Sequence, residues 1–586
     1  MDMIKVVING KEYSVANGST VLEAARAANI DIPTLCYLKD INEIGACRLC
    51  LVEVAEMRGP ALGPWRMVTA CVYPCTEGMQ IKTNTPKIAA SRKMNLELLL
   101  SNHNQDCLSC VRSTNCELQA LCREYGVASS KFVGDTTKYE IDDKTPIIRD
   151  NNKCILCRRC VAACAKIQEI GVIGANNRGF DTYVGSAFEQ ALADTSCINC
   201  GQCIVACPVG ALYERDDTDK VFEAIADPTK HTVICTAPSV RAQIGECFGY
   251  EPGTDCEGKM VAALKALGFD GVYDMNLTAD LTIVEEANEL LGRIQNNGTL
   301  PMITSCSPGW IKYCEHYFPE FVDNLSSCKS PQQMFGAIVK TYYAEKMGWD
   351  PKDIVMVSAI PCTAKKFEVG RPDQSAAGVP DVDYAITTRE VGRMIQKAGI
   401  NFRALEDEKF DEPFGIGSSA GAIFGATGGV MEAALRYAAE VILGKKLEKV
   451  EFNEVRGVEG IKTASYKLGD LTVNVAVASS TGMAKKLLNM VKNGELDVQF
   501  IEIMACPGGC VNGGGQPIQP AKVRMSMDLR AVRASVLYND DANDTLRKSQ
   551  DNLAVQKLYD EYLGTPNSHK AHEILHTSYV KRGLYQ

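Results

Sequence analysis

The sequence predicts an α/β protein in which several small cysteine-rich domains precede one large α/β domain. At 586 residues the chain is long enough for several domains. Most of its 26 cysteines fall in closely spaced groups before residue 210. From Pro228 onward, apolar runs such as DIVMVSAIPC alternate with helical patterns such as GVMEAALRYAAEVILG, which is typical of buried strands between helices. We expect domains at 1–80, 81–140, 141–220 and 228–586.

The first range, residues 1–80, is predicted to hold a 2Fe–2S cluster. IKVVI and KEYSV flank Asn9-Gly10, a pair typical of a hairpin turn, and a helix-like VLEAARAANI follows. Four cysteines come next, at gaps of ten, two and twenty residues: Cys36, Cys47, Cys50 and Cys71. This order resembles β-grasp 2Fe–2S ferredoxins, with a longer first gap than in the plant type. Zinc is the alternative for these cysteines.

The second range, 81–140, contains the segment HNQDCLSCVRSTNC. It brings together four possible metal ligands: His103, Cys107, Cys110 and Cys116. Taken alone, these residues suit a tetrahedral zinc ion and an iron–sulfur cluster equally well. Their position between two iron–sulfur domains favours a His-ligated 4Fe–4S cluster.

The third range, 141–220, repeats the spacing C-x-x-C-x-x-C-x-x-x-C. The two runs are CILCRRCVAAC and CINCGQCIVACP, with Cys154, Cys157, Cys160, Cys164, Cys197, Cys200, Cys203 and Cys207. This doubled pattern is the signature of two-cluster bacterial ferredoxins, in which the fourth cysteine of each run binds the other run's cluster. Four clusters in a row predict an electron wire that ends in the last domain.

Three cysteine segments mark the last range, 228–586. They are TSCSPGW at 304–310, IPCTAKKFE at 360–368 and EIMACPGGCVNGGGQP at 502–517. Each cysteine follows a predicted strand and lies beside Pro or Gly, where ligands can converge at one end of a sheet. No G-x-G-x-x-G motif follows a strand, so we expect no flavin or nicotinamide site in this chain.

Composition and charge argue against two classes of protein, nucleic-acid-binding proteins and membrane-spanning proteins. The net charge of −10 and pI of about 5.4 argue against nucleic-acid binding. No apolar stretch approaches 18 residues, so no membrane span is expected. The N-terminal residues lack a signal-peptide pattern, which predicts a cytoplasmic protein.

The three segments resemble the signature loops of iron-only (FeFe) hydrogenases. The resemblance covers the whole chain, to the closing HEILH at 572–576, and matches the long, multi-cluster group A form. The cluster order is similar to that of the catalytic subunit of NAD(P)-linked and electron-bifurcating hydrogenases. The resemblance implies reversible interconversion of protons and dihydrogen at an H-cluster, which is a 4Fe–4S cubane joined to a two-iron centre with CO, CN and a bridging dithiolate.

The resemblance also implies roles for individual residues. Cys362, Cys506 and Cys510 match cubane ligands, with Cys510 bridging to the two-iron centre. Lys365 would hold a cyanide and Met504 would pack against the two irons. The remaining cofactor contacts would come from Ile360, where many relatives have methionine, and from Ser330, Gln332 and Phe424. The proton path would run through Glu286, Ser326, Glu289 and Arg293.

Cys306 and Ser307 depart from the family pattern of two adjacent cysteines. Cys306 aligns with the proton carrier and Ser307 with the fourth cubane ligand. Three accounts are open: Ser307 ligates through oxygen, the loop shifts so that Cys306 ligates, or the cubane has three protein ligands. We favour Cys306 as the residue near the two-iron centre.

The resemblance implies partner proteins as well. The expected partners are a ferredoxin, or NAD(P)-linked flavoprotein and thioredoxin-like 2Fe–2S subunits, together with hydrogenase maturases. The alternative function is a hydrogen-sensing or electron-transfer subunit of the same fold with little turnover.

Overall fold

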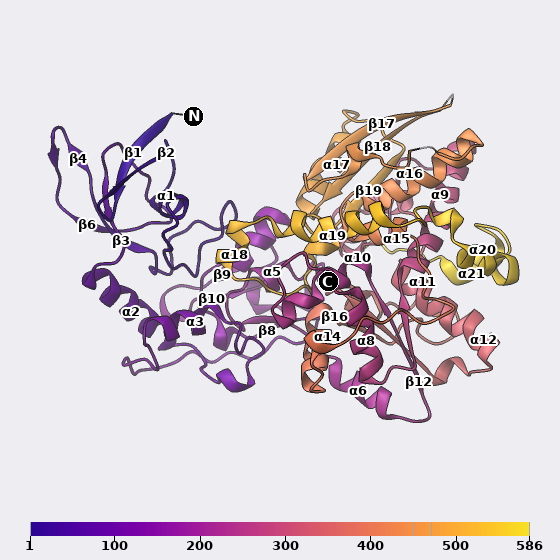
Figure 1. Cartoon of the computed structure of the whole chain (residues 1–586), viewed down its shortest axis with the longest axis horizontal. Helices are drawn as coiled ribbons and strands as arrows, with labels where there is room; N and C mark the ends of the chain where they lie inside the picture. The colour runs from indigo at the N-terminus through magenta and orange to yellow at the C-terminus, as the bar shows by residue number, and fades with distance from the viewer. Residues whose placement is uncertain (1, 448, 470, 585–586) are drawn as a thin grey trace.

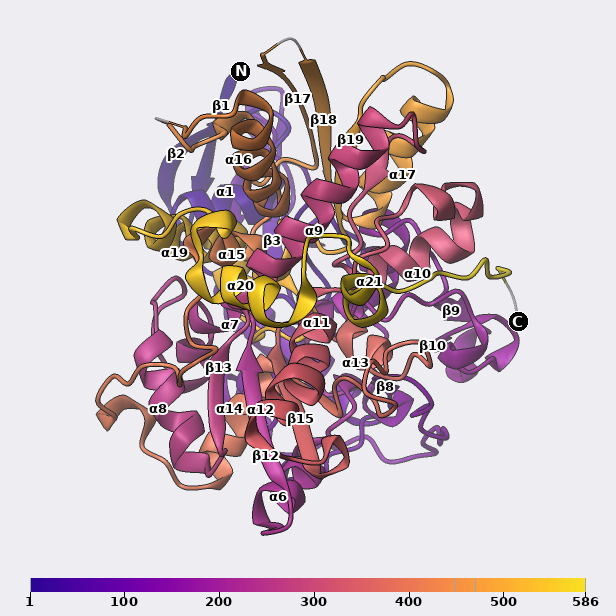
Figure 2. The same cartoon turned by 90° about the vertical axis from the view of Figure 1, so that its right-hand side faces the viewer.

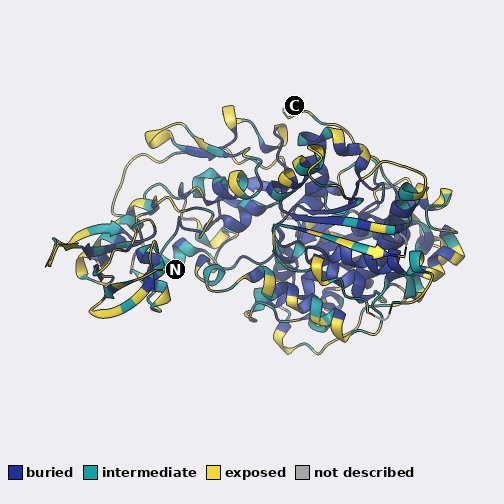
Figure 3. Cartoon of the chain, turned by 90° about the horizontal axis from the view of Figure 1, so that it is seen from above, coloured by how far each residue is buried: buried dark blue, intermediate teal, exposed yellow. Residues whose placement is uncertain are grey.

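The computed structural model describes residues 2–447, 449–469 and 471–584. Figure 1 shows an elongated arrangement, with the N-terminal domains on one side and a larger C-terminal part on the other. Figure 3 shows that buried residues concentrate in the larger part. No helix among the described residues combines the length and apolarity that crossing a bilayer requires.

The N-terminal domain is a five-stranded sheet with the order β2-β1-β7-β3-β6. Its strands are β1 (Met3–Ile8), β2 (Lys11–Ala16), β3 (Leu51–Ala55), β6 (Arg66–Thr69) and β7 (Gln80–Lys82). Asn9 and Gly10 both have positive φ, at 50° and 85°, so the predicted hairpin turn is confirmed. Helix α1 (Val21–Ala27) begins with a capping box between Thr20 and Glu23.

Two small cysteine-bearing units connect this sheet to the C-terminal part. The first contains helices α2 (Pro86–Leu100) and α3 (Glu117–Glu124). The second is built from two similar halves, each with one short strand and one short helix. These elements are β8 (Ile147–Arg149), α4 (Arg159–Ala162), α5 (Gln202–Ala206) and β11 (Leu212–Glu214), and the two strands pair antiparallel. A hairpin of β9 (Gly174–Asn176) and β10 (Tyr183–Gly185) separates the halves.

The C-terminal part contains two four-stranded sheets rather than one. The first has the order β13-β12-β15-β16 and is parallel throughout. Its strands are β12 (His231–Thr236), β13 (Gly271–Asp274), β15 (Ile354–Ile360) and β16 (Tyr384–Thr387). The second has the order β14-β19-β18-β17, in which only β17 is antiparallel. Its strands are β14 (Met302–Ile303), β17 (Ile461–Leu468), β18 (Leu471–Ser479) and β19 (Phe500–Met504).

Helices pack around both sheets, which confirms the predicted α/β class (Figure 2). The longest, α9 (Asn276–Gln295), is buried along most of its length and contacts α11 (Pro331–Ile338) and α16 (Gly429–Leu443). The chain closes with α19 (Leu529–Asn543) and α21 (His569–Leu575). Loops that follow parallel strands meet at the carboxyl ends of the sheets, where ligand sites of α/β proteins form.

Candidate metal centre

Loops after β12, β14, β15 and β19 enclose a cavity of about 70 Å³. Its lining is mostly apolar, with one cation, Lys365, and three cysteines: Cys306, Cys362 and Cys510. Other predicted site residues complete the wall: Ser307, Gln332, Ile360, Phe424 and Met504. Residues more than 200 positions apart in the sequence therefore meet at this cavity.

A second cavity of about 20 Å³ adjoins the first. Cys506 lines only this smaller cavity, whereas Ser307, Cys362 and Cys510 line both. Cys306 lines only the larger one. Cys510 is therefore placed where a sulfur could join groups held in the two cavities, and Cys306 and Ser307 face different surroundings.

The donor set fits a cluster joined to an anionic group. Lys365 is buried, and its Nζ donates to Glu368 Oε2 at 2.9 Å. Ser330 Oγ and Gln332 Nε2 donate to the same carboxylate oxygen at 2.9 and 3.1 Å. Glu368 thus holds three predicted residues together. Two buried polar atoms at the cavity, Ser239 Oγ and Gln332 Oε1, have no partner among the described residues.

Sequence reasoning missed Glu368 and Ser239. Glu368 lies within IPCTAKKFE, three residues after Lys365, and this i, i+3 spacing was the available signal. Ser239 comes shortly after strand β12, in the sequence TAPS. The cysteine segments also come directly after strands. Ser330 is the predicted cofactor contact that does not line the larger cavity.

A chain of polar residues leads from Cys306 toward the surface. Burial and the nearby Glu289 raise the pKa of Glu286 to about 8. Ser326 and the Ser305 N–H oppose this shift, but neither carboxyl oxygen of Glu286 has a hydrogen bond of good geometry to any described residue. Ser326 Oγ donates to Glu289 Oε2 at 2.8 Å, and Arg293 donates to Glu289 Oε1 at 2.6 Å.

The thiol of Cys306 is kept protonated by its surroundings. Burial and the neighbouring Glu286 raise the pKa of Cys306 well above its usual value. Glu286, Glu289 and Arg293 follow one another along α9, and Ser326 bonds Glu289 from the segment 326–328. Arg293 is partly exposed.

The doubled cysteine runs form two further cavities. One of about 30 Å³ is lined by Cys164, Cys197, Cys200 and Cys203, and one of about 20 Å³ by Cys154, Cys157, Cys160 and Cys207. Each cavity thus takes the fourth cysteine from the other run, as the two-cluster pattern predicts. Cys200 also lines the small cavity beside Cys506, so this residue touches both a ferredoxin-type site and the centre.

A pair of glycines lets these two regions touch through their backbones. A Cβ added to Gly514 would lie 2.3 Å from the Cys200 carbonyl oxygen, and one added to Gly201 would lie 2.9 Å from Gly514 Cα. Both distances are shorter than real Cβ contacts allow. Gln202 Nε2 adds a hydrogen bond of 2.8 Å to the carbonyl of Asn512.

The first four cysteines also gather at one place. Cys36, Cys47, Cys50 and Cys71 are all buried, and the sulfurs of Cys50 and Cys71 lie 3.3 Å apart. Asn42 Nδ2 donates to the carbonyls of both Cys36 and Cys157, at 2.7 and 3.0 Å. This amide, which sequence reasoning missed, connects the first cysteine loop directly to a ferredoxin-type loop.

His103 has the character of an available ligand. Burial lowers the pKa of His103, which keeps the ring neutral, and its Nδ1 has no partner among the described residues. Arg112, within the same segment, donates to the Cys207 carbonyl at 2.9 Å. The His103 segment therefore also packs against a ferredoxin-type loop.

Comparison with known proteins decides the family. A profile described as iron only hydrogenase large subunit, C-terminal domain, matches residues 230–514. The NADP-reducing hydrogenase subunit HndD of Solidesulfovibrio fructosivorans is 47% identical over 99% of this chain and 100% of its own length. The chain belongs to the iron-only hydrogenase family. Iron hydrogenase 1 of Clostridium pasteurianum is 45% identical over 99% of this hydrogenase and all of its own length.

Further profiles cover the rest of this hydrogenase. A 2Fe-2S iron-sulfur cluster binding domain matches 1–86, an NADH-ubiquinone oxidoreductase-G iron-sulfur binding region 92–131, and an NADH-quinone oxidoreductase subunit 3 ferredoxin-like domain 145–213. A profile described as iron hydrogenase small subunit matches 527–582, so the last helices correspond to a unit that the sequence analysis did not separate. The solved apo-hydrogenase HydA1 of Chlamydomonas reinhardtii aligns over 63% of this chain and 100% of its own, with a TM-score of 0.56 and 42% identity.

Proposed function

We propose that this iron-only hydrogenase interconverts protons and dihydrogen at an H-cluster held by Cys362, Cys506 and Cys510, with Ser307 beside the cubane. The observation that carries the assignment is the pair of adjoining cavities that share Cys510. When bound, the H-cluster supplies the chemistry that makes and breaks dihydrogen. The protein supplies an apolar cavity, a proton path and an electron path.

The proton path begins at Cys306. Its protonated thiol faces the larger cavity, so it can give a proton to the cavity and take one from Glu286. A carboxyl whose pKa lies near 8 exchanges protons readily at neutral pH. Ser326 and Glu289 then pass protons between Glu286 and the partly exposed Arg293 end of the path.

The electron path consists of one 2Fe–2S and three 4Fe–4S clusters at the predicted cysteines and His103. A residue that lines two cavities supports electron transfer from the ferredoxin-type clusters to the centre. Cys200 lines both its own cluster cavity and the small cavity of the centre. Asn42 and Arg112 connect the two outer loops to the cysteine runs. No flavin or nicotinamide is proposed in this chain.

We propose NAD(P)-linked flavoprotein and thioredoxin-like 2Fe–2S subunits, or a ferredoxin, as electron partners in the cytoplasm. The name of the 47% identical relative, an NADP-reducing hydrogenase subunit, supports the first option. The small-subunit profile lies within this chain, so the proposed partners are additional to it. The hydrogen-sensing alternative is less favoured, because all proposed path residues are present.

The test is an infrared spectrum of protein matured with the hydrogenase maturases, together with turnover measurements. Bands of bound CO and CN and fast dihydrogen production from reduced ferredoxin would support the proposal. Bands without turnover would favour the sensing alternative, and absence of the bands would remove the two-iron centre. Comparing reduced ferredoxin with NADPH as sole donor, with and without flavoprotein subunits, separates the two partner options.

A further inference from the structure

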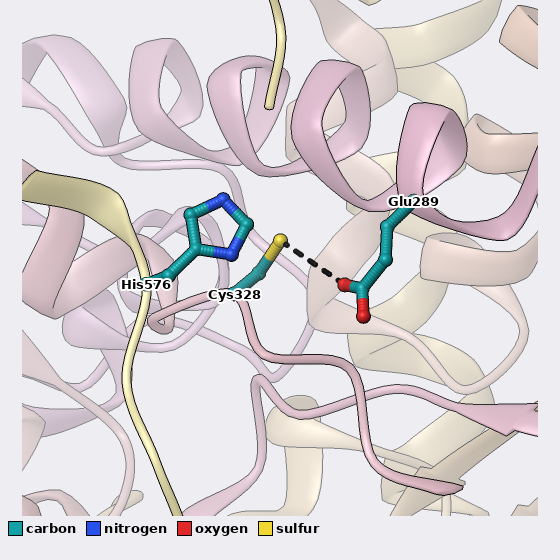
Figure 4. A group of neighbouring side chains, drawn as sticks. All are labelled: Glu289, Cys328 and His576. Atoms are coloured by element: carbon teal, nitrogen blue, oxygen red, sulfur yellow. Dashed lines mark hydrogen bonds between the residues drawn. The ribbon is translucent and has the colours of Figure 1, made fainter. Parts of the chain in front are cut away.

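Three potential metal ligands outside the proposed centre converge beside the proton path. Figure 4 shows Glu289 on α9, Cys328 in the loop before α11 and His576 near the C-terminus pointing toward one another. One ligand atom from each lies within 4.8 Å of the other two. The Cys328 thiol donates to Glu289 Oε2 at 3.8 Å. Ligand atoms of one tetrahedral zinc ion are about 3.5 Å apart, given Zn–S near 2.3 Å and Zn–O near 2.0 Å.

The backbone holds two of these residues as a fixed pair. Cys328 and His576 face each other in an isolated antiparallel bridge. On either side, Lys329 N donates to Leu575 O at 2.7 Å and Thr577 N donates to Ser327 O at 2.8 Å. Side chains of such directly opposed residues lie close together, so this part of the site is formed before any ion arrives.

The histidine is oriented as a zinc-bound histidine usually is. His576 Nε2 lies 3.1 Å from Glu285 Oε2, and Glu285 is itself fixed by Tyr559 Oη at 2.5 Å and Asn567 N at 2.9 Å. Metal-ligating histidines commonly donate their second N–H to a carboxylate, which fixes the ring and makes the other nitrogen a better ligand. Among the residues that the structure describes, that other nitrogen, Nδ1, is paired with the Ser327 hydroxyl alone, at 2.8 Å, and a hydroxyl can rotate away.

We propose that Glu289, Cys328 and His576 form a binding site for a single Zn²⁺ ion, with Glu285 as the orienting carboxylate. The fourth ligand would be water or the Ser327 hydroxyl. The charges balance, because two carboxylates and a thiolate would face Zn²⁺ and the Arg293 guanidinium, which lies 2.6 Å from Glu289. His572 is exposed and its ring centroid lies 3.9 Å from that of His576, so the site lies close to the protein surface.

Zinc at this site would inhibit turnover, because it would occupy the Glu289 carboxylate. Only this consequence rests on the proposed proton path; zinc binding itself does not. Zinc would displace the Cys328 proton to solvent on binding, and Glu289, once it ligates the ion, could no longer exchange protons with Ser326.

The first experiment measures zinc binding to the full chain made without maturases, which retains its accessory clusters. Equilibrium dialysis with Zn²⁺ alone is compared for the wild type, Cys328→Ala, His576→Gln, Glu285→Gln and a matched control, Cys314→Ala, which removes another fully buried thiol. Cys328→Ala and His576→Gln should each weaken binding at least ~10-fold, and Glu285→Gln by roughly 10–100-fold. The control should bind as the wild type does, and the iron content of every sample should stay constant.

X-ray absorption at the zinc edge identifies the ligands. One sulfur and three nitrogen or oxygen neighbours are expected. Three or four sulfurs would show zinc at cluster cysteines and overturn the proposal, as would equal affinity of Cys328→Ala and Cys314→Ala.

The second experiment measures dihydrogen production by the matured enzyme in zinc. Wild type and Cys314→Ala should be inhibited at the zinc concentration that fills the site, and Cys328→Ala should need at least ~10-fold more. If zinc fills the site by absorption spectroscopy and turnover is unchanged, the zinc site stands and the proposed path through Glu289 fails.

Discussion

Replacing Glu286 by glutamine tests the proton path and the electrostatics of its burial together. The change keeps the size of the side chain and removes its ability to carry a proton. General acid–base steps contribute roughly 10²–10⁴-fold to rates, so dihydrogen production should fall by a factor in that range. The iron content and the CO and CN infrared bands should not change, because Glu286 is not a proposed cluster ligand.

The same substitution should change stability in a pH-dependent way. A free glutamate has a pKa near 4.3, whereas burial and Glu289 raise the pKa of Glu286 to about 8. The stabilising contribution of neutral Glu286 is therefore complete below about pH 4 and is lost as the pH rises through about 8. A tenfold change in a protonation equilibrium corresponds to about 1.4 kcal/mol, so the wild type should lose roughly 2 kcal/mol of stability between pH 6 and pH 8 through this group. Glutamine does not ionise, so Glu286→Gln should not lose this stability between pH 6 and pH 8.

Thermal unfolding at one scan rate, at pH 6 and at pH 8, measures this difference. The Tm of Glu286→Gln minus that of the wild type should be larger at pH 8 than at pH 6 by about 2–3 °C, because the entropy of unfolding is large for a unit of this length. Thr282→Val is a matched control, because Thr282 is buried on the same helix and its hydroxyl bonds the Thr278 carbonyl and the Met334 sulfur. The control should keep turnover and show the same Tm gap at both pH values. Turnover above about a tenth of wild type in Glu286→Gln would refute the path, and a pH-independent Tm gap would refute the raised pKa.

Three further predictions concern the clusters. Cys306→Ala should keep every cluster and lose roughly 10²–10⁴-fold in turnover. Cys306→Asp should recover part of the turnover, since a carboxylate also carries protons. Loss of the cubane from Cys306→Ala, seen by iron analysis, would instead make Cys306 a ligand. His103→Cys should keep a 4Fe–4S cluster at a lower reduction potential, because thiolate is more negative than imidazole. A redox titration followed by electron paramagnetic resonance measures this potential. Zinc in place of iron would disprove the assignment. Matured protein should contain about 20 irons per chain and protein made without maturases about 18; values near 12 to 14 would remove the terminal centre.

The cysteine groups could be predicted from the sequence because metal ligation depends on short spacings. The gaps within each run place three cysteines on one loop, and the doubled pattern even indicates the exchange of Cys164 and Cys207 between the two cavities. Apolar runs likewise marked the buried strands of the α/β part. Both kinds of signal are local.

Features that depend on contacts between distant loops could not be predicted. Apolar runs do not show which strands pair, so the division into two four-stranded sheets was not foreseen. Asn42 and Glu368 look like ordinary polar residues, yet each holds together residues from separate segments. Cys328 belongs to no spaced cysteine group in the sequence, yet the fold places it against Glu289.

The contact between Gly201 and Gly514 limits how this molecule can be divided or recombined. No side chain fits between the two backbones at their present separation, so a larger residue at either position would force the ferredoxin-type unit and the catalytic loop apart. An engineer who grafts a different electron-carrying unit onto this catalytic part must therefore reproduce both glycines, not only the cysteine motifs. Natural recombination that joins another ferredoxin-type unit to this catalytic part would meet the same restriction.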